Sequence, residues 1–79
     1  PTTGTGTVVA GGTDTAMRVT GGSSPVTVTF GTAFAVAPVC VCSNGTTAAD
    51  GCKTSAEGTG TVVVTTAGTD TFSLICVGK

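Results

Sequence analysis

The stretch Val26-Thr-Val-Thr-Phe30 places an apolar side chain at every second position, with threonine hydroxyls between them. Strict alternation of this kind is typical of a β-strand that turns one face to a core and the other to solvent. Valine and threonine are stiff at χ1 and favour strands, and they recur through most of the 79 residues. No stretch shows a helical period. The sequence therefore predicts an all-β domain.

Further strands are predicted on both sides of this one. They share its apolar and polar pattern, are bounded by turn residues, and comprise residues 5–9, 14–20, 39–42, 52–55, 59–66 and 69–77. The last two are expected to form a hairpin joined near Ala67-Gly68. The one long loop, residues 43–51, contains Asn44-Gly45 and Asp50-Gly51, two dipeptides that favour turns.

The strand that follows Pro38 is apolar on both faces. Cys40 and Cys42 share one face, and Val39 and Val41 share the other. Because strands with two apolar faces are usually covered on both sides, we expect a second layer over the valines. Proline has no N–H group to give to a ladder, so Pro38 suits only the start of a strand or an edge strand.

The four cysteines, at positions 40, 42, 52 and 76, are dense for a chain of this length. A zinc site is disfavoured, because Cys40 and Cys42 lack the usual two-residue spacer and the chain has no histidine. A redox-active pair would need Cys-x-x-Cys near a helix start, which the sequence lacks. The pattern favours two structural disulfides, with free buried thiols as the alternative, and we predict no metal and no cofactor.

Three pairings of these cysteines are open. A Cys42–Cys52 bond would close the 43–51 loop and stabilise the fold by about 3 kcal/mol on the chain-entropy model. A Cys40–Cys76 bond would tie a central strand to the last strand and contribute about 4 kcal/mol. A Cys40–Cys42 bond is disfavoured, because adjacent side chains on one face of a strand diverge.

Charge is scarce, with four acidic and three basic residues and a net charge of −1. Without a basic cluster, nucleic acid is not an expected partner. The longest apolar run, residues 33–42, is interrupted by Pro38 and is too short to cross a bilayer, so we expect no membrane insertion. The first residues lack the features of a signal peptide, and we expect residues 1–79 to be a single domain cut from a longer protein.

Catalysis is not expected of these residues. Asp14 and Asp70 lie in Gly-Thr-Asp-Thr turns, where aspartate usually caps backbone N–H groups, and Glu57 is expected to be solvated. Glycoside hydrolysis would require two carboxylates at a defined separation, and the absence of histidine excludes Ser–His and Cys–His mechanisms within this chain. We therefore predict no enzyme and no catalytic residue.

Large core-forming side chains are few: three phenylalanines and one residue each of methionine, leucine and isoleucine. A chain of this size buries only about 60 % of the surface that its unfolded form exposes. Domains of this kind usually need disulfides, a metal or oligomerisation. The poor core, the low charge and the strand with two apolar faces together favour an oligomer.

A longer segment carries a resemblance to a known family. Residues 26–40, Val-Thr-Val-Thr-Phe-Gly-Thr-Ala-Phe-Ala-Val-Ala-Pro-Val-Cys, resemble a stretch in the C-terminal domains of bacteriophage tail fibres and tailspikes. The ending Phe72-Ser-Leu-Ile-Cys-Val-Gly-Lys79 is similar to that family's last strand, cysteine and Gly-Lys. The likeness spans residues 22–79. Cys42 and Cys52 look like an additional pair, and the family's tyrosine before the final cysteine is absent.

The resemblance implies a small antiparallel β-sandwich, jelly-roll-like and homotrimeric, that caps the distal end of a fibre. Its implied function is trimerisation and attachment to a bacterial surface receptor, for example a polysaccharide, at the tail tip of the virion. A related resemblance, to H-type lectins, rests on the Phe30-x-x-x-Phe34-x-x-x-Pro38 spacing. It leaves a trimeric lectin-like module that binds a cell-surface glycan as the alternative.

The candidate receptor-binding residues are Asn44, Asp50 and Lys53, in or beside the long loop. Loops on a rigid scaffold commonly carry recognition, and amide and carboxylate groups can bind sugar hydroxyls. The competing interpretation is that Asn44 and Asp50 simply form turns. Phe30 and Phe34 are expected to lie in the core.

Overall fold

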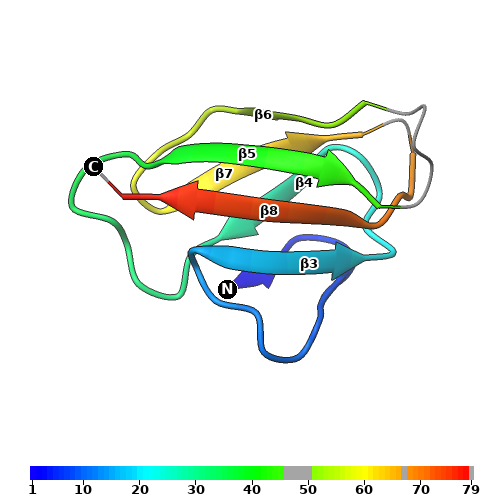
Figure 1. The fold of residues 1–79 in the computed structure, drawn as a ribbon, viewed down its shortest axis with the longest axis horizontal. Coiled ribbons are helices and arrows are strands. Elements are labelled where there is room, and N and C mark those ends of the chain that lie inside the picture. The colour runs from blue at the N-terminus through cyan, green and yellow to red at the C-terminus, as the bar shows by residue number, and fades with distance from the viewer. Residues whose placement is uncertain (46–50, 67, 79) are drawn as a thin grey trace.

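The computed structural model describes residues 1–45, 51–66 and 68–78. These residues form two antiparallel four-stranded sheets that pack as a β-sandwich, without a helix (Figure 1). The strands are β1 (Thr2–Thr3), β2 (Thr7–Val8), β3 (Ala16–Thr20), β4 (Val26–Thr29), β5 (Val39–Asn44), β6 (Lys53–Ser55), β7 (Thr61–Thr65) and β8 (Phe72–Val77). The predicted all-β class is confirmed. Nor do the described residues include a helix that could span a membrane.

The chain alternates between the two sheets. The first sheet has the order β1-β4-β7-β6, and the second sheet has the order β2-β3-β8-β5. Only the β2–β3 and β6–β7 connections join strands that pair with each other, and every other connection crosses from one sheet to the other. Each half of the sequence therefore contributes strands to both layers.

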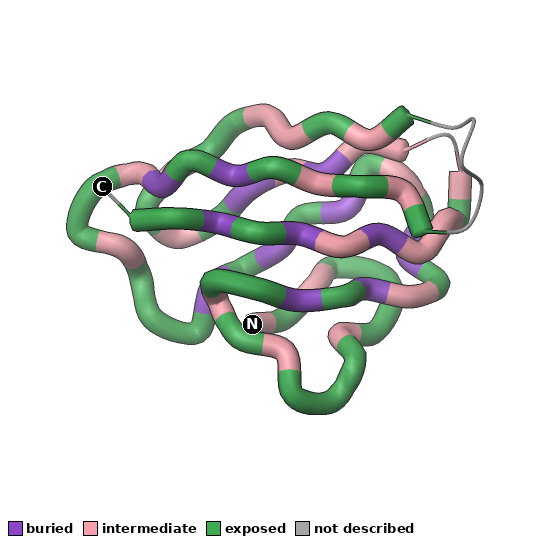
Figure 2. Tube along the Cα trace, in the orientation of Figure 1, coloured by how far each residue is buried: buried purple, intermediate pink, exposed green. Residues whose placement is uncertain are grey.

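The core lies between the sheets and is built by the alternation seen in the sequence. In β4, Val26 and Val28 are buried whereas Thr27 and Thr29 are exposed. The buried hydrophobic side chains are Met17, Val19, Val26, Val28, Phe30, Cys40, Val62, Val64, Phe72, Leu74 and Cys76. Figure 2 shows the same alternation of buried and exposed positions along β5 and β8.

The two phenylalanines expected in the core close one end of it. Phe30 is 6 % exposed, and Phe34 packs against the core from the β4–β5 connection. Their rings meet edge to face, with centroids 4.9 Å apart and planes at 79°. This geometry is favourable for aromatic pairs. The Phe30 and Phe34 prediction is confirmed.

The hairpin predicted for residues 59–66 and 69–77 is wrong. β7 pairs with β4 and β6 in the first sheet, whereas β8 pairs with β3 and β5 in the second. The short connection around Gly68 crosses between the sheets because it is held by the β3–β4 connection. Ser24 N–H donates to Gly68 O at 3.1 Å, and Thr66 N–H donates to Ser24 Oγ at 2.9 Å.

The first predicted strand is shorter than expected and has an unpredicted neighbour. Gly6 interrupts it with φ +79°, and a Cβ at this position would lie 2.7 Å from Gly22 Cα and from Thr20 O. Glycine is therefore required where the chain passes the 20–22 turn. β2 begins after Gly6, and the residues before it form β1, which pairs with β4.

Candidate functional site

The two ends of the sandwich carry different segments of the chain. At one end, here called the terminal end, Pro1 lies near Gly31 and Asp14, and Gly78 lies near Phe34 (Figure 1). The opposite end, here called the loop end, receives the described parts of the β3–β4, β5–β6 and β7–β8 connections. The two ends can therefore serve different functions.

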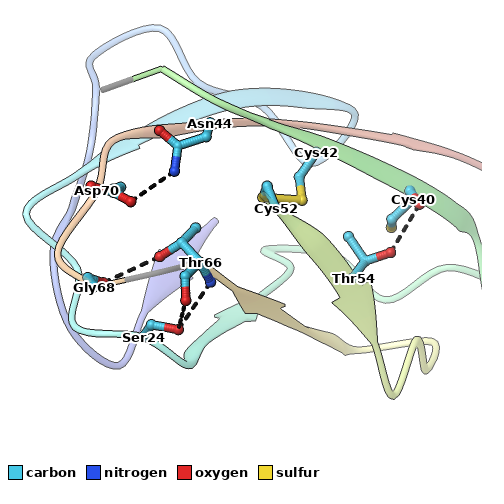
Figure 3. Close-up of a disulfide and its surroundings, with 9 residues drawn as sticks. All are labelled: Ser24, Cys40, Cys42, Asn44, Cys52, Thr54, Thr66, Gly68 and Asp70. Carbon is cyan, nitrogen blue, oxygen red and sulfur yellow. Dashed lines mark hydrogen bonds between the residues drawn. A yellow bond between two sulfur atoms is a disulfide. The ribbon is translucent and has the colours of Figure 1, made fainter. Parts of the chain in front are cut away.

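Asn44 lies at the loop end as the last residue of β5 and is half-buried. Its Nδ2 atom donates a hydrogen bond of 2.8 Å to Oδ2 of Asp70, in the β7–β8 connection (Figure 3). Asn44 also pairs with Phe72 in the β5–β8 ladder, so it belongs to the strand at the point where the chain leaves β5. A strand pairing and a side-chain bond to a second loop fix this amide in place.

Lys53, the second predicted receptor-binding residue, also lies at the loop end. It is the exposed first residue of β6 and pairs with Thr65. Cys52 precedes it and is bonded to Cys42, two positions before Asn44, so the disulfide brings the two segments together. Asp50, the third predicted residue, lies outside the described residues.

All four cysteines form disulfides, Cys40–Cys76 and Cys42–Cys52, and the disulfide prediction is confirmed. Cys40 and Cys76 are directly opposed in β5 and β8, with Cα atoms 4.1 Å apart. The Cys76 N–H donates to Thr15 O, on the side away from β5, at 3.0 Å. Cys40 and Cys76 are therefore a non-hydrogen-bonded pair, the kind in which opposed residues come closest.

The Cys42–Cys52 disulfide joins the two sheets at one edge. β5 and β6 are the outermost strands of their sheets. Beside the disulfide, Thr54 Oγ1 donates to Cys40 O at 3.0 Å (Figure 3). These two links hold β6 against an edge strand that would otherwise expose its backbone. Pro38 immediately precedes β5, which agrees with its predicted place at the start of a strand or in an edge strand. The expectation that Cys40 lies in a central strand is wrong, because β5 is the outermost strand of its sheet.

A third set of links fixes the loop end through hydroxyl groups. Ser24 Oγ donates to Thr66 O at 3.0 Å and accepts from Thr66 N–H at 2.9 Å. Thr66 Oγ1 donates to Gly68 O at 3.2 Å (Figure 3). The β3–β4 and β7–β8 connections are thereby tied to each other. At the loop end, hydrogen bonds therefore hold Asn44, Asp70 and these hydroxyl groups in place.

Asp14 has a structural role at the terminal end. Its carboxylate accepts hydrogen bonds from Gly31 N–H at 2.9 Å and Thr32 N–H at 3.0 Å, and the Pro1 amine lies 3.6 Å away. These two N–H groups, aided by the amine, hold the pKa of the Asp14 carboxyl below its ordinary value. The predicted capping role is confirmed, although the capped groups belong to the β4–β5 connection rather than to the turn that contains Asp14.

The other carboxylates of the described residues have different surroundings. Asp70 accepts from Asn44 at the loop end, and Glu57 is exposed in the β6–β7 connection. Within residues 1–45, 51–66 and 68–78, no three His, Cys, Asp or Glu side chains gather as a metal site would require.

The outer face of the second sheet is apolar near the terminal end. Val39, Val41, Ile75 and Val77 are each 50–61 % exposed on this face. They stand in rows across the strands: Val39 is opposite Val77, and Val41 is opposite Ile75, which is in turn opposite Ala16. Among residues 1–45, 51–66 and 68–78, none forms the expected cover over Val39 and Val41, which are 50 % and 59 % exposed.

The site residues that sequence reasoning missed are long-range partners. Ser24 and Thr66 gave no signal, and Asp70 was expected to cap backbone N–H groups rather than to bind the Asn44 amide, because these hydrogen bonds join segments far apart in the sequence. Ile75 and Val77 did carry a signal, since they alternate with the buried Leu74 and Cys76 and mark β8 as a second strand with two apolar faces. The same pattern in Val39 and Val41 was recognised.

Comparison with known proteins finds no match for this chain among family models, curated proteins or solved structures. Its function is therefore inferred from the sequence and the geometry above.

Proposed function

We propose that this domain is a non-catalytic module that trimerises and attaches to the host, as a jelly-roll-like cap at the distal end of a bacteriophage tail fibre or tailspike. The observation that carries the proposal is the apolar, solvent-exposed face formed by Val39, Val41, Ile75 and Val77. Monomeric proteins rarely expose contiguous apolar patches of large area, and such patches mark interaction sites. The resemblance in residues 26–40 and 72–79 supports the choice of a phage fibre or tailspike as the protein in which this module would serve.

The composition of the core supports an assembling module. Its largest fully buried side chains are one Phe and one Leu, followed by valines and a cysteine. A small core of this kind leaves limited stability in the single chain, and subunit association adds buried surface. Eight strands in two sheets is also the strand number of a jelly roll.

The two ends of the sandwich suit a cap. Pro1 and Gly78 lie at the terminal end, so a preceding stalk would join the domain there. The loop end then points away from the stalk and toward the bacterial surface, at the tail tip of the virion. Asn44 and Lys53 lie at that end, with Asp50 in the connection between them, and they remain our candidates for contact with a receptor such as a polysaccharide.

A non-catalytic role agrees with how the carboxylates are used. Asp14 binds two backbone N–H groups and Asp70 binds the Asn44 amide, at opposite ends of the sandwich. A glycosidase pair would instead present two carboxylates roughly 5–9.5 Å apart on either side of a sugar.

A lectin-like module that binds a cell-surface glycan is the second candidate. The observation that favours it is the Asn44–Asp70 pair, an amide and a carboxylate held together at the loop end. Such groups can bind sugar hydroxyls once they are fixed in place. This candidate needs the same trimer, and it differs in placing glycan recognition at Asn44 and Asp70.

The test is the solution mass of the 79-residue chain by light scattering after gel filtration, with and without reductant, followed by binding to bacterial cells. We expect the mass of three 7.4 kDa chains and retention on susceptible cells. A monomer under both conditions would overturn the trimeric cap. Binding to purified surface glycan that Asp70→Ala abolishes and Lys53→Ala does not, with the trimer mass unchanged in both variants, would favour the lectin-like alternative.

A further inference from the structure

We infer that the outer face of the second sheet is the surface on which a second copy of this chain docks, with the two chains parallel. The inference rests on the proposed trimer and adds to it the surface, the partner and the orientation. The face in question is formed by β3, β8 and β5 and is turned toward the viewer in Figures 1 and 2.

The chemistry of this face is graded along the strands. Two apolar rows, Val39–Val77 and Val41–Ile75–Ala16, lie nearer the terminal end. The next row, Ser43–Ser73–Arg18, is polar and lies nearer the loop end. Apolar contact is therefore available at one half of the face, while the half beside the loops remains hydrated.

The face also combines raised and hollow parts. Beside the valines, a hollow of about 370 Å³ lies between the β2–β3 connection and strands β3 and β8. Its lining includes Val9, Gly12, Ala16 and Ile75, and also Arg18 and Ser73 from the polar row. Ile75 belongs to both features, so the hollow continues directly into the valine rows. The valines of one copy can fill the hollow of the next, and this head-to-tail contact gives a ring of three when neighbouring copies are related by a rotation of about 120°.

The area available favours a whole sheet face as the interface. A specific interface buries roughly 800 Å² on each partner. Each protomer of a ring takes part in two such contacts, which together bury about two fifths of the 4016 Å² that the chain exposes. The molecule measures 33 × 22 × 17 Å, so contacts of this size must use a broad sheet face rather than its narrow edges.

The other broad face does not offer the same chemistry. The outer face of the first sheet presents Thr27, Thr29, Thr61, Lys53 and Ser55, with Val63 half-buried among them. Hydroxyl groups and a lysine are well solvated, and burying them without partners costs free energy. Of the two sheet faces, the second sheet's is the one that gains by being covered.

The grading along the strands selects a parallel arrangement of copies of this chain. When the symmetry axis runs along the strands, each row lies at the same height in every protomer, and apolar rows meet apolar rows. An axis across the strands brings the Ser43–Ser73–Arg18 row of one copy toward the valines of the other. An apolar face gains nothing from charged groups on its partner. A second copy of this chain meets that condition, because only 9 % of its residues are charged.

The experiment places one lysine on each sheet face of the 79-residue chain. Val41→Lys puts an ammonium in the proposed interface, and Val63→Lys makes the same change on the outer face of the first sheet. We measure the mass of each variant by light scattering over a dilution series, and its folding by circular dichroism. We expect Val41→Lys to raise the trimer dissociation constant by roughly a hundredfold or more, because an unpaired charge is costly to bury, and Val63→Lys to leave it within a few-fold.

The outcomes separate this inference from the proposed function. A trimeric parent whose mass is unchanged by Val41→Lys overturns the assigned face and leaves the trimer standing. A monomeric parent overturns both. If Val41→Lys fails to fold, Val41→Thr replaces it, since threonine keeps the shape and the strand preference of valine. Its expected effect is roughly tenfold weaker association, and an unchanged constant overturns the inference.

Discussion

The Cys42–Cys52 disulfide joins β5, the outermost strand of the second sheet, to the residue immediately before β6, the outermost strand of the first sheet. Both of its cysteines are half-buried, whereas Cys40 is 5 % exposed and Cys76 is 1 % exposed. The two disulfides thus differ in place and in access: one joins the sheets at the surface of the loop end, and the other lies in the core between two strands of one sheet.

We expect the Cys42–Cys52 bond to be reduced first under native conditions. A thiolate must reach the disulfide to attack it, and access to Cys40 and Cys76 requires opening of the core. Pulsed reduction, alkylation and peptide mass mapping measure the order. Equal labelling rates for all four cysteines would contradict it. The Cys42→Ala/Cys52→Ala variant should lose about 3 kcal/mol of unfolding free energy and keep its fold.

We expect Asp14 to make the stability of the domain fall in acid. Its folded pKa is lowered by the N–H groups of Gly31 and Thr32, so the carboxylate stabilises the fold above the unfolded value near 4. That contribution is lost as the pH falls through the folded pKa. The Asp14→Asn variant should therefore have an unfolding free energy at pH 7 about 2 kcal/mol lower than that of the parent chain. Between pH 5 and pH 2, the unfolding free energy of the variant should fall by less than that of the parent.

The measurement for Asp14 is the unfolding free energy from denaturant titration at fixed protein concentration across this pH range. Glu57→Gln is the control, because Glu57 is exposed. The expectation fails if Asp14→Asn and the parent chain show the same slope of stability against pH.

Much of the fold was readable from the sequence because alternation reports which face of a strand is buried. The residues on either side of Val26 and Val28 in β4, and of Leu74 and Cys76 in β8, are enough to predict which face of each strand is buried. Strand pairing is different, because it depends on residues far along the chain. β7 and β8 are close in sequence but lie in different sheets, and nothing local shows that Ser24 holds the connection between them.

The candidate site divides in the same way. The cysteines and the loop that they close were predictable from residue type and spacing. The partner of Asn44 was not, since Asp70 is 26 positions away and sits in a motif that reads as an ordinary turn. β1 was missed for a further reason: two threonines are too few to show a period.

We expect neighbouring residues of β8 to separate folding from assembly. Leu74 is fully buried in the core, whereas Ile75 is 50 % exposed on the outer face. Leu74→Ala should cost about 3 kcal/mol of unfolding free energy, through the lost burial and the cavity left behind. Ile75→Ala should leave the thermal midpoint of the dilute monomer nearly unchanged and weaken self-association. Calorimetry measures the stability of each variant, and light scattering measures its self-association. A loss of monomer stability from Ile75→Ala would contradict the assignment of Ile75 to assembly alone.

Two glycine-containing segments, 4–6 and 20–22, approach each other closely where the chain enters the sandwich. Gly6 and Gly21 both have positive φ, +79° and +68°, so alanine at either position is strained by about 1–2 kcal/mol. The surroundings differ: a Cβ on Gly6 would meet Gly22 Cα at 2.7 Å, whereas a Cβ on Gly21 meets nothing within 4 Å. Gly6→Ala should therefore cost about 2 kcal/mol more than Gly21→Ala, because backbone must move to admit the methyl group.

The comparison of Gly6→Ala with Gly21→Ala tests whether the 20–22 turn positions the 4–6 segment, between β1 and β2. A total stability of roughly 4–12 kcal/mol is ordinary for a domain of this length, so Gly6→Ala would remove a large part of it. Denaturant titration of both variants at one protein concentration gives the difference directly. Equal losses would mean that the 4–6 segment can withdraw from the 20–22 turn at little cost, and that β1 and β2 hold their places through strand pairing alone. A larger loss for Gly6→Ala would show that the turn itself positions them.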